Sequence, residues 1–323
     1  MRILVTGASG FVGTALVQRL LQDPAAQIVA AARTPPTTGW SRVEPALTGD
    51  LGPQTDWRQP LADTEVVVHL AARVHVMHDQ AVDPLAACRR VNVEGTLRLA
   101  RQAIDAGVRR FVYLSSIKVN GEHTDAGQPF RADDHVTPND PYGISKLEAE
   151  KGLRALAAGS GLQVVILRPP LVYGPGVRAN FRSMMGWLRR GLPLPLGAVN
   201  NRRSLIALDN LCDLIAICTQ HPAATGQTFL ASDGEDVSTP ELLLRLGAAL
   251  GTPARLLPLP AGLLQRLLVI LGQRSVAQRL CASLQVDIGP TRALLGWQPP
   301  LSLDEGLRRT AQAFLAETAP HPK

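Results

Sequence analysis

Residues 1–13 read MRILVTGASGFVG, a short apolar run that leads into a turn with a glycine at every third position. The three glycines are Gly7, Gly10 and Gly13. Residues 2–6 have the composition of a buried strand, and an apolar helical pattern starts at Phe11. In such a turn the first glycine permits the sharp bend, the second lets the main chain approach a pyrophosphate, and the third lets the helix pack closely on the strand. The stretch therefore predicts a strand, a phosphate-binding turn and a helix whose N-terminus faces a dinucleotide.

The alternation of apolar runs and helical patterns continues through the first half of the chain. Expected strands are 2–6, 28–32, 66–70, 110–114 and 164–167, and expected helices are 11–21, 85–106 and 142–158. Continuous Val, Ile and Leu runs separated by helices predict a parallel sheet covered on both faces, because each crossover needs a helix. We therefore expect an α/β fold, a doubly wound parallel sheet of the Rossmann type, over residues 1–170.

The second half of the chain no longer alternates regularly between strand and helix patterns. Proline and glycine punctuate the loops at 173–176 and 192–197, and the helical patterns at 239–250 and 303–315 are no longer separated by regular strands. We expect residues 171–323 to form a smaller α/β region that mainly binds substrate, with some segments returning to the first domain. That region should cap the carboxyl ends of the strands, where open α/β sheets bind ligands.

Charge and composition exclude several classes of partner. The chain has 33 Lys and Arg and a net charge of +6, but the basic residues are scattered without a run, so we expect a polyanionic small ligand and no nucleic acid. The N-terminus lacks the features of a signal peptide. The four cysteines form no CxxC pair, which is typical of reduced thiols in a cytoplasmic protein.

Residues 261–272 are the most apolar helical stretch, interrupted by Gln265 and Arg266. The stretch falls short of the roughly 20 residues that span a bilayer, so we expect no stable membrane insertion. We interpret it as a buried or interface helix, with a membrane-surface helix as the less favoured alternative.

The residue after the second expected strand bears on the choice of cofactor. NAD-preferring enzymes usually carry an acidic residue there to hold the ribose hydroxyls, and this chain has Arg33. A guanidinium can pair with a 2′-phosphate, so NADP(H) is favoured and NAD(H) is possible, the alternative being an ordinary surface arginine. Asp50 and Leu51, interpreted as the end of the third strand, are expected beside the adenine unless they form a simple turn.

Tyr142 and Lys146 are spaced four residues apart, which places a phenol and an ammonium on one face of a helix. A nearby positive charge lowers the pKa of a tyrosine, so the pair can exchange a proton near neutral pH. Ser115 and Ser116 follow the strand expected at 110–114, where a hydroxyl can hold a carbonyl oxygen at the carboxyl end of the sheet.

Taken in order, these motifs resemble the extended short-chain dehydrogenase/reductase family of nucleotide-sugar epimerases and dehydratases. The matching segments are Gly7/Gly10/Gly13, His69 to Ala72, Asn92 to Thr96, Ser115-Ser116, Tyr142/Lys146, Arg168 to Gly174, Arg203 to Asp209 and Asp287 to Pro299. They span nearly the whole chain. The resemblance implies a homodimer through the helices near 85–106 and 142–158.

The resemblance implies roles residue by residue. Ser116, Tyr142 and Lys146 would be catalytic, and Asn92 would support them. Cofactor contacts would come from the glycine turn with Phe11 and Val12, from Arg33, Asp50 and Leu51, from Leu70, Ala71 and Ala72, and from Tyr142, Lys146 and Pro169, with Arg168 near the nicotinamide. Substrate contacts would come from Ser116, Asn180, Phe181 and Arg203. An arginine can bind a pyrophosphate through two nitrogens, although Arg203 could also be an ordinary surface charge. Asn180 could be a loop amide without a ligand, and Phe181 could be a ring packed in the core.

Two further patterns narrow the chemistry. Family dehydratases carry acidic residues just after the catalytic hydroxyl, and this chain has Ile117 and Lys118 there, so we set dehydration aside. His75 and His78 form an HxxH pair, but no third ligand with zinc-like spacing accompanies them. We expect no metal site.

The function expected from these residues is hydride transfer between a nicotinamide and C4 of a UDP-sugar. The segments 69–77 and 115–121 resemble bacterial O-antigen pathway proteins, among them UDP-glucose 4-epimerase-like proteins and reductases of UDP-4-keto-6-deoxy-N-acetylglucosamine. We favour reduction of a UDP-4-keto-6-deoxy-N-acetylhexosamine, and 4-epimerisation of UDP-glucose or UDP-N-acetylglucosamine is the alternative. A non-catalytic NADP-binding regulatory protein is a remote third, because Ser116, Tyr142 and Lys146 are all retained.

Overall fold

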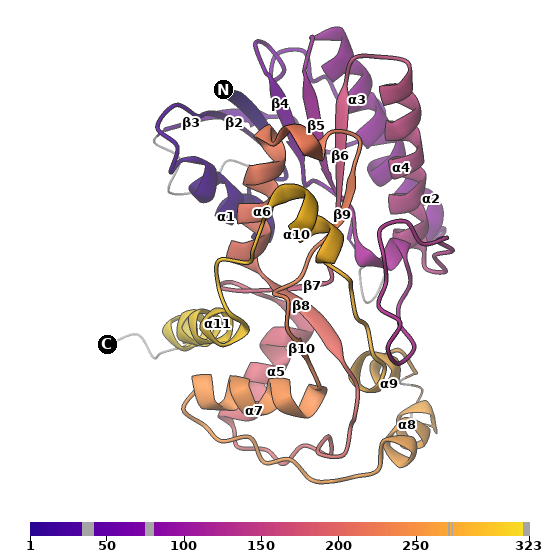
Figure 1. Ribbon diagram of the computed structural model, residues 1–323, viewed down its shortest axis with the longest axis vertical. Coiled ribbons are helices and arrows are strands. Elements are labelled where there is room, and N and C mark those ends of the chain that lie inside the picture. The colour runs from indigo at the N-terminus through magenta and orange to yellow at the C-terminus, as the bar shows by residue number, and fades with distance from the viewer. Residues whose placement is uncertain (34–41, 75–80, 271, 273, 319–323) are drawn as a thin grey trace.

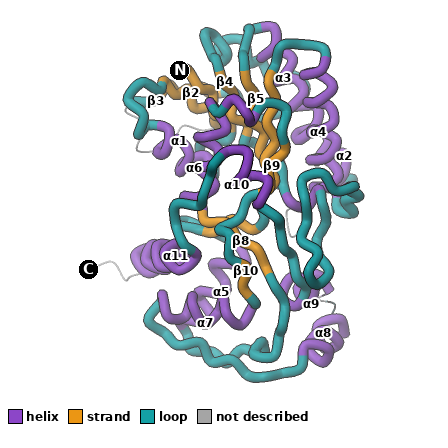
Figure 2. The backbone as a smooth tube through the Cα atoms, viewed as in Figure 1, coloured by secondary structure: helices purple, strands orange, loops and turns teal. Residues whose placement is uncertain are grey.

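The computed structural model describes residues 1–33, 42–74, 81–270, 272 and 274–318 (Figure 1). His75 and His78 lie outside the described residues. A large sheet with its helices occupies one end of the molecule, and a smaller region built around a second sheet occupies the other (Figure 2).

The large sheet has seven strands in the order β3-β2-β1-β4-β5-β6-β9. Every neighbouring pair is parallel. The strands are β1 (Arg2–Thr6), β2 (Gln27–Ala32), β3 (Val43–Leu47), β4 (Val66–His69), β5 (Arg110–Leu114), β6 (Gln163–Arg168) and β9 (Thr228–Leu230). The order reverses between β1 and β4, which is where doubly wound folds bind their ligands. The predicted fold class is confirmed.

Alternate residues of the central strands enter two separate cores. Ile3 and Val5 pack into the core shared with α1 (Phe11–Leu20) and α6 (Leu208–Gln220). Leu4 points to the opposite face, into the core of α3 (Thr96–Asp105) and α4 (Pro141–Ala158). Both faces of the sheet are therefore covered, as the continuous apolar runs predicted (Figure 1).

The segment expected as one helix at 85–106 is interrupted. It begins as α2 (Pro84–Cys88), which the carboxylate of Asp83 caps through the Ala86 N–H, and ends as α3. Between them Arg89–Gly95 forms a π-helical turn. Such turns occur mostly as single bulges within α-helices, often at functional sites.

The third strand ends earlier than the sequence suggested. β3 closes at Leu47, so Asp50 and Leu51 lie in the loop that follows it and the expectation that they end the strand was wrong. Edge strand β3 carries Pro45, and edge strands tolerate a proline because one side of the strand needs no ladder hydrogen bond.

The smaller region holds a three-stranded sheet in the order β10-β8-β7, with β7 (Leu171–Tyr173), β8 (Arg203–Ala207) and β10 (Asp236–Val237). Its helices are α5 (Ala179–Arg189), α7 (Thr239–Ala249), α8 (Ala261–Ile270), α9 (Arg274–Cys281) and α11 (Leu303–Thr318). A separate core, including Tyr173, Leu243 and Leu307, joins β7, α7 and α11.

Residues beyond 170 also return to the large sheet. β9 pairs with β6, α6 packs with α1, and α10 (Gly289–Leu295) covers β9 (Figure 1). Phe11, at the start of α1, packs against the cores of both regions. The smaller region is thus joined to the carboxyl ends of the strands at the position of the glycine-rich turn.

Candidate active site

The glycine-rich turn is held by contacts that leave no room for side chains. Gly7 has a φ of +67°, and a Cβ there would lie 2.8 Å from the Ala71 nitrogen. A Cβ on Gly13 would lie 2.1 Å from the Gly7 carbonyl oxygen, because helix α1 leaves the turn so close to β1. Gly10 is exposed, and its N–H donates to the Gly7 carbonyl at 2.9 Å. The main chain at the start of α1 is therefore accessible to a ligand at Gly10, whereas at Gly7 and Gly13 it packs against neighbouring main chain.

The carboxyl end of β4 is tied to this turn. The Ala71 N–H donates to the Thr6 hydroxyl at 3.2 Å, and Leu70 donates to the Thr6 carbonyl at 3.3 Å. Leu70, Ala71 and Ala72 are all partly exposed. They follow β4 at the point where the strand order reverses, so their main chain borders the candidate cofactor cleft.

His69 is a buried neutral base beneath that segment. Its Nδ1 lies 2.7 Å from the Thr6 hydroxyl and its Nε2 lies 2.9 Å from the Thr96 hydroxyl. Burial, reinforced by the charge of Lys146, lowers the pKa of His69 to about 3. The ring therefore acts as a hydrogen-bond bridge between β1, β4 and α3, and not as a charged ligand.

Arg33 lies at the end of β2 with its guanidinium in solvent. Its side chain is 78% exposed, and its Nη1 lies 3.6 Å from the Asp50 carboxylate, which is 90% exposed. Leu51 packs against Gly95, where a Cβ would lie 2.9 Å from the leucine Cγ. The structure thus brings Arg33 and Asp50 together after β2 and β3, with Leu51 next to Asp50 in the same loop, and an exposed pair of this kind contributes little to stability.

Helix α4 begins at Pro141, one residue before the predicted start. The carboxylate of Asp140 caps it by accepting from the Gly143 N–H at 3.3 Å, and Pro141 occupies the first turn, where its missing N–H costs nothing. Tyr142 lies one residue inside this end and is partly exposed. The cap therefore fixes the direction in which the phenol leaves the helix.

Tyr142 and Ser116 meet across α4 and the end of β5. Burial and the charge of Asp140 raise the pKa of Tyr142, while a hydrogen bond from Ser116 lowers it. The expectation that Lys146 lowers the pKa of Tyr142 was wrong, because burial dominates at both residues, and the raised pKa keeps the phenol protonated at neutral pH. The pair therefore presents two hydroxyl groups side by side, one of which holds a transferable proton.

Lys146 lies one turn further along α4 and is 2% exposed. Its Nζ donates to the Leu114 carbonyl at 2.7 Å and lies 5.8 Å from the centre of the Tyr142 ring. Burial lowers the pKa of Lys146 to about 7, although Glu150 opposes that shift. A buried amine of this pKa can gain or lose a proton near neutral pH.

Asn92 lies within the π-helical turn and is buried. Its Nδ2 donates to the Ser145 hydroxyl at 2.9 Å and to the Arg73 carbonyl at 3.0 Å, and its Oδ1 accepts from the Arg73 N–H at 2.8 Å. The Ser145 hydroxyl in turn donates to the Tyr142 carbonyl at 2.8 Å. Asn92 therefore fixes the first turn of α4 and the chain after Ala72.

Glu150, which the sequence patterns did not single out, forms a buried network that includes Ser115, so of the two expected serines the hydroxyl of Ser115 is already engaged. The Glu150 carboxylate accepts from the Ser115 hydroxyl at 2.5 Å and from both Nε and Nη2 of Arg168, at 2.9 and 2.6 Å. Arg168 also donates to the Asn120 side chain at 3.0 Å. The signal available in the sequence was the spacing of Glu150, four residues after Lys146 on the same helix face.

Arg168 is part of this network. The guanidinium is 4% exposed and engaged by Glu150 and Asn120, so its charge is paired within the protein; its position near the nicotinamide stays a prediction. Pro169 is buried and accepts from the Ile117 N–H at 3.0 Å through its carbonyl oxygen. It therefore lies directly behind the Ser116 segment.

Lys118, where family dehydratases carry acidic residues, is paired. Its Nζ lies 3.1 Å from the Glu122 carboxylate and 3.3 Å from that of Asp140. The residue after Ser116, Ile117, is buried. No carboxylate stands at positions 117 and 118 to take a proton from a sugar carbon.

The expected substrate residues lie in the smaller region. Asn180 is exposed on the first turn of α5, after Ala179 with a φ of +53°. Phe181 is 2% exposed and stacks on Tyr173 with ring centres 5.5 Å apart, so its side chain belongs to the core and only its main chain can meet a ligand. Arg203 is half-buried at the start of β8, and its Nη1 donates to the Ala282 carbonyl at 2.9 Å.

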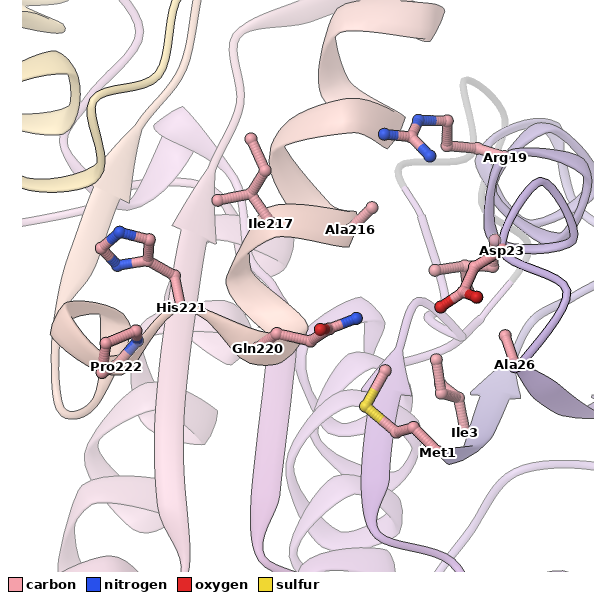
Figure 3. A pocket seen from close by; sticks show the side chains of 11 residues that line it. Met1, Ile3, Arg19, Asp23, Ala26, Ala216, Ile217, Gln220, His221 and Pro222 are labelled. Atoms are coloured by element: carbon pink, nitrogen blue, oxygen red, sulfur yellow. The ribbon is translucent and has the colours of Figure 1, made fainter.

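A pocket of about 460 Å³ lies elsewhere (Figure 3). Met1 and Ile3 line it at the amino end of β1, together with the ends of α1 and α6. Its Arg19 guanidinium is engaged by Asp213 at 2.8 Å. Because doubly wound sheets bind ligands at the opposite, carboxyl ends of their strands, we assign this pocket no part in the site. Among the described residues no group of three or more His, Cys, Asp or Glu side chains is arranged to hold a metal ion.

Residues 3–231 match the family model described as the NAD dependent epimerase/dehydratase family. The chain belongs to that family. It is a nucleotide-sugar epimerase/dehydratase-family enzyme of the extended short-chain dehydrogenase type, as the motifs predicted.

Three similar proteins illustrate the range of the family. A UDP-glucose 4-epimerase of Vibrio cholerae is 48% identical over 97% of this chain and 95% of its own length. An N-acetyl-α-D-glucosaminyl-diphospho-ditrans,octacis-undecaprenol 4-epimerase of Escherichia coli O157:H7 is 28% identical over 96% of this chain and 94% of its own length. The solved structure of MoeE5 in complex with UDP-glucuronic acid and NAD is 27% identical, covers 98% of this chain and 100% of its own, and has a TM-score of 0.77.

Proposed function

We propose that this enzyme transfers hydride to C4 of a UDP-linked sugar, and that its net reaction is reduction of a UDP-4-keto-6-deoxy-N-acetylhexosamine. The observation that carries the proposal is the group formed by Ser116, Tyr142 and Lys146 at the carboxyl end of β5. A hydroxyl that holds a carbonyl oxygen and a phenol that supplies a proton are what a carbonyl reduction requires.

The residues present fit a dinucleotide. Gly7 and Gly13 close the inner side of the turn, and the exposed Gly10 leaves the start of α1 open to a pyrophosphate. Leu70, Ala71 and Ala72 would border the cofactor from β4, and Pro169 would close the site behind Ser116. A bound nicotinamide supplies the hydride that C4 receives.

The protein's own residues supply the proton and hold the reacting oxygen. Tyr142 gives its proton to O4 as C4 gains a hydride, so a C=O group becomes CH–OH. Ser116 holds O4 during the transfer. Lys146 stabilises the resulting phenolate and would hold the nicotinamide ribose, and Asn92 keeps the first turn of α4 in place through Ser145.

Arg33 favours NADP(H) over NAD(H). Its exposed guanidinium lies 3.6 Å from the exposed carboxylate of Asp50, and a 2′-phosphate can take the place of that carboxylate at little cost. Cells generally keep the NADP pool reduced for biosynthesis, which suits net reduction. NAD(H) remains the second choice of cofactor.

The nucleotide diphosphate would meet three groups in the smaller region. Asn180 and the main chain of Phe181 lie in the first turn of α5, where N–H groups have no partner within the helix and attract anions. The half-buried Arg203 offers a planar fork for a diphosphate. Burial lowers the pKa of Arg203, so an anionic partner would relieve the cost of burying its charge.

A 4-epimerase is the second candidate, and the 48% identical Vibrio cholerae relative favours it. An epimerase oxidises C4, turns the ketone over and returns the same hydride, so it gains from holding the reduced cofactor tightly. A reductase must exchange its cofactor in every cycle. The two differ in cofactor stoichiometry, although both use the same three residues.

The deciding experiment has two arms. In the first, the keto sugar is generated by a separate dehydratase and oxidation of NADPH or NADH is followed by absorbance. In the second, UDP-N-acetylglucosamine and UDP-glucose are incubated without added cofactor and analysed for their C4 epimers. One reduced cofactor consumed per sugar, with no epimer in the second arm, is the result expected. Epimer formation without cofactor consumption would establish the epimerase, and no reaction in either arm would leave the non-catalytic NADP-binding protein.

We also propose a homodimer through the helices of residues 84–105 and α4. Light scattering on the purified enzyme should give twice the mass of the 34.5 kDa chain. A monomer at micromolar concentration would contradict this.

A further inference from the structure

Helix α8 carries a stripe of exposed apolar side chains. Leu263, Leu267 and Ile270 are spaced i, i+4 and i+7, which aligns them on one helix face, and they are 47%, 45% and 81% exposed. Leu264, on another face, is 6% exposed and belongs to the core of the smaller region. The helix is therefore anchored to the protein on one face and apolar toward solvent on another, so of the buried or interface helix that the sequence predicted, the buried form was wrong.

The charged residues in the stretch of sequence that contains this stripe are all arginines. Residues 242–286 contain five arginines and neither aspartate nor glutamate. Arg266 lies on α8 beside the stripe, Arg255 lies in the preceding loop, and both are exposed. Leu257, in the same loop, is 52% exposed. The stripe is thus bordered by cations without nearby carboxylates in sequence.

The position of α8 leaves it accessible. It lies with α9 at the end of the molecule farthest from the amino ends of the large sheet, and the loop that leads to it runs along that end (Figure 1). Neither the glycine-rich turn nor Tyr142 is on this helix. A flat surface can approach α8 without touching the large sheet.

We propose that α8 docks the enzyme on an anionic membrane surface, with Leu263, Leu267 and Ile270 in the acyl boundary and Arg255 and Arg266 at the headgroups. A short amphipathic helix with apolar residues on one face and arginines beside them binds in this way, because apolar burial and attraction to anionic lipid add together. No helix in the described part of the chain is long and apolar enough to cross a membrane. At 1.5 Å per residue α8 is about 15 Å long, so it lies on the surface.

Other occupants fit the charge less well. A second copy joined through a two-fold contact at α8 would bring the same arginines together, with no carboxylate on residues 242–286 to oppose them. Three leucine-sized side chains are also a small apolar core for a stable protein interface, which usually buries about 800 Å² on each partner. The inference is independent of which reaction occurs at C4.

The test is flotation of the purified enzyme with vesicles of phosphatidylcholine, alone or mixed with phosphatidylglycerol. Binding to the mixed vesicles should exceed binding to phosphatidylcholine at least tenfold and fall as salt is raised. The triple variant Leu263→Gln/Leu267→Gln/Ile270→Gln and the pair Arg255→Gln/Arg266→Gln should each lose at least tenfold. The matched control is Leu244→Gln on α7, an equally exposed leucine outside α8, which should bind like the parent.

Solution turnover separates this proposal from its rivals. All variants should keep the parent's turnover and KM without vesicles, because none touches the proposed site. No vesicle binding by the folded parent, or binding that ignores phosphatidylglycerol, would overturn the proposal. A parent dimer that the α8 triple variant converts to monomer would replace the membrane with a second copy, and a raised KM for the sugar nucleotide would make α8 a cover of the substrate site.

Discussion

The Ser115 hydroxyl donates to the Glu150 carboxylate across 2.5 Å, joining the residue before Ser116 to the helix that carries Tyr142 and Lys146. The same carboxylate holds the buried Arg168. One side chain therefore fixes β5, α4 and β6 relative to each other directly behind the proposed catalytic group. Removal of the Glu150 carboxylate should therefore lower the stability of the protein and displace Ser116.

Glu150→Gln should destabilise the protein by about 3–5 kcal/mol, because it leaves the Arg168 charge buried without a partner. The matched control is Glu148→Gln, which breaks the exposed ion pair of Glu148 with Arg89 and should cost about 0–1 kcal/mol. Urea unfolding of both variants at pH 7 measures the difference. Equal stability of the two variants would show that the buried pair contributes no more than the exposed one.

Tyr142→Phe should reduce turnover at least roughly a hundredfold while cofactor binding stays nearly unchanged, because the ring still packs but the proton is gone. Lys146→Ala should reduce both turnover and cofactor binding, because the ribose contact is lost and the phenolate no longer has a neighbouring positive charge. Steady-state rates and titration with reduced cofactor provide the two readouts. Near-normal turnover of Tyr142→Phe would refute the assigned mechanism.

Arg33→Gln should weaken NADPH binding by about 1.5–3 kcal/mol, the range of a hydrogen bond to a charged group, and leave NADH binding unchanged. Asp50→Asn is the informative companion, because it frees the guanidinium from its 3.6 Å partner and should not weaken NADPH. Dissociation constants for both cofactors are measured by fluorescence titration. A parent enzyme that binds NADH as tightly as NADPH would show that Arg33 is an ordinary surface residue.

His69 should make stability depend on pH in acid. Its pKa is about 3 when folded and 6.5 in the unfolded reference, so the unfolded chain binds the extra proton between these values. Folding stability should therefore be complete above pH 6.5 and fall by up to about 1.4 kcal/mol per unit as pH drops toward 3. His69→Asn should be less stable at pH 7 but lose this part of the slope. An unchanged slope in urea unfolding between pH 4.5 and 6.5 would exclude His69 as its source.

The sequence predicted the elements whose structure depends on neighbouring residues. The strand at Arg2–Thr6 and the glycine turn depend on neighbouring residues, and the structure has them at the expected positions; α4 starts at Pro141, one residue before the expected start. The pairing of β9 in the large sheet depends on contacts with β6, more than sixty residues away, and three residues carry no usable periodicity.

The environments of Arg168 and Phe181 depend on how deeply each side chain is buried, which the sequence did not indicate. Arg168 and Phe181 lie next to motifs that bind ligands in the family, yet Glu150 engages one and Tyr173 stacks on the other. Glu150 lies on another element, α4, and Tyr173 faces Phe181 only once β7 and α5 pack together, so both contacts depend on the tertiary structure.

The π-helical turn at Arg89–Gly95 makes the length of this segment as important as its side chains. A π turn holds one residue more than an α turn, so deleting one residue ahead of Asn92 would let the chain close as a regular α-helix. Helix formation would not suffer, but the Asn92 side chain would rotate by about 100° and leave Ser145. A single-residue deletion ahead of Asn92 should therefore be as damaging as loss of the Asn92 side chain itself.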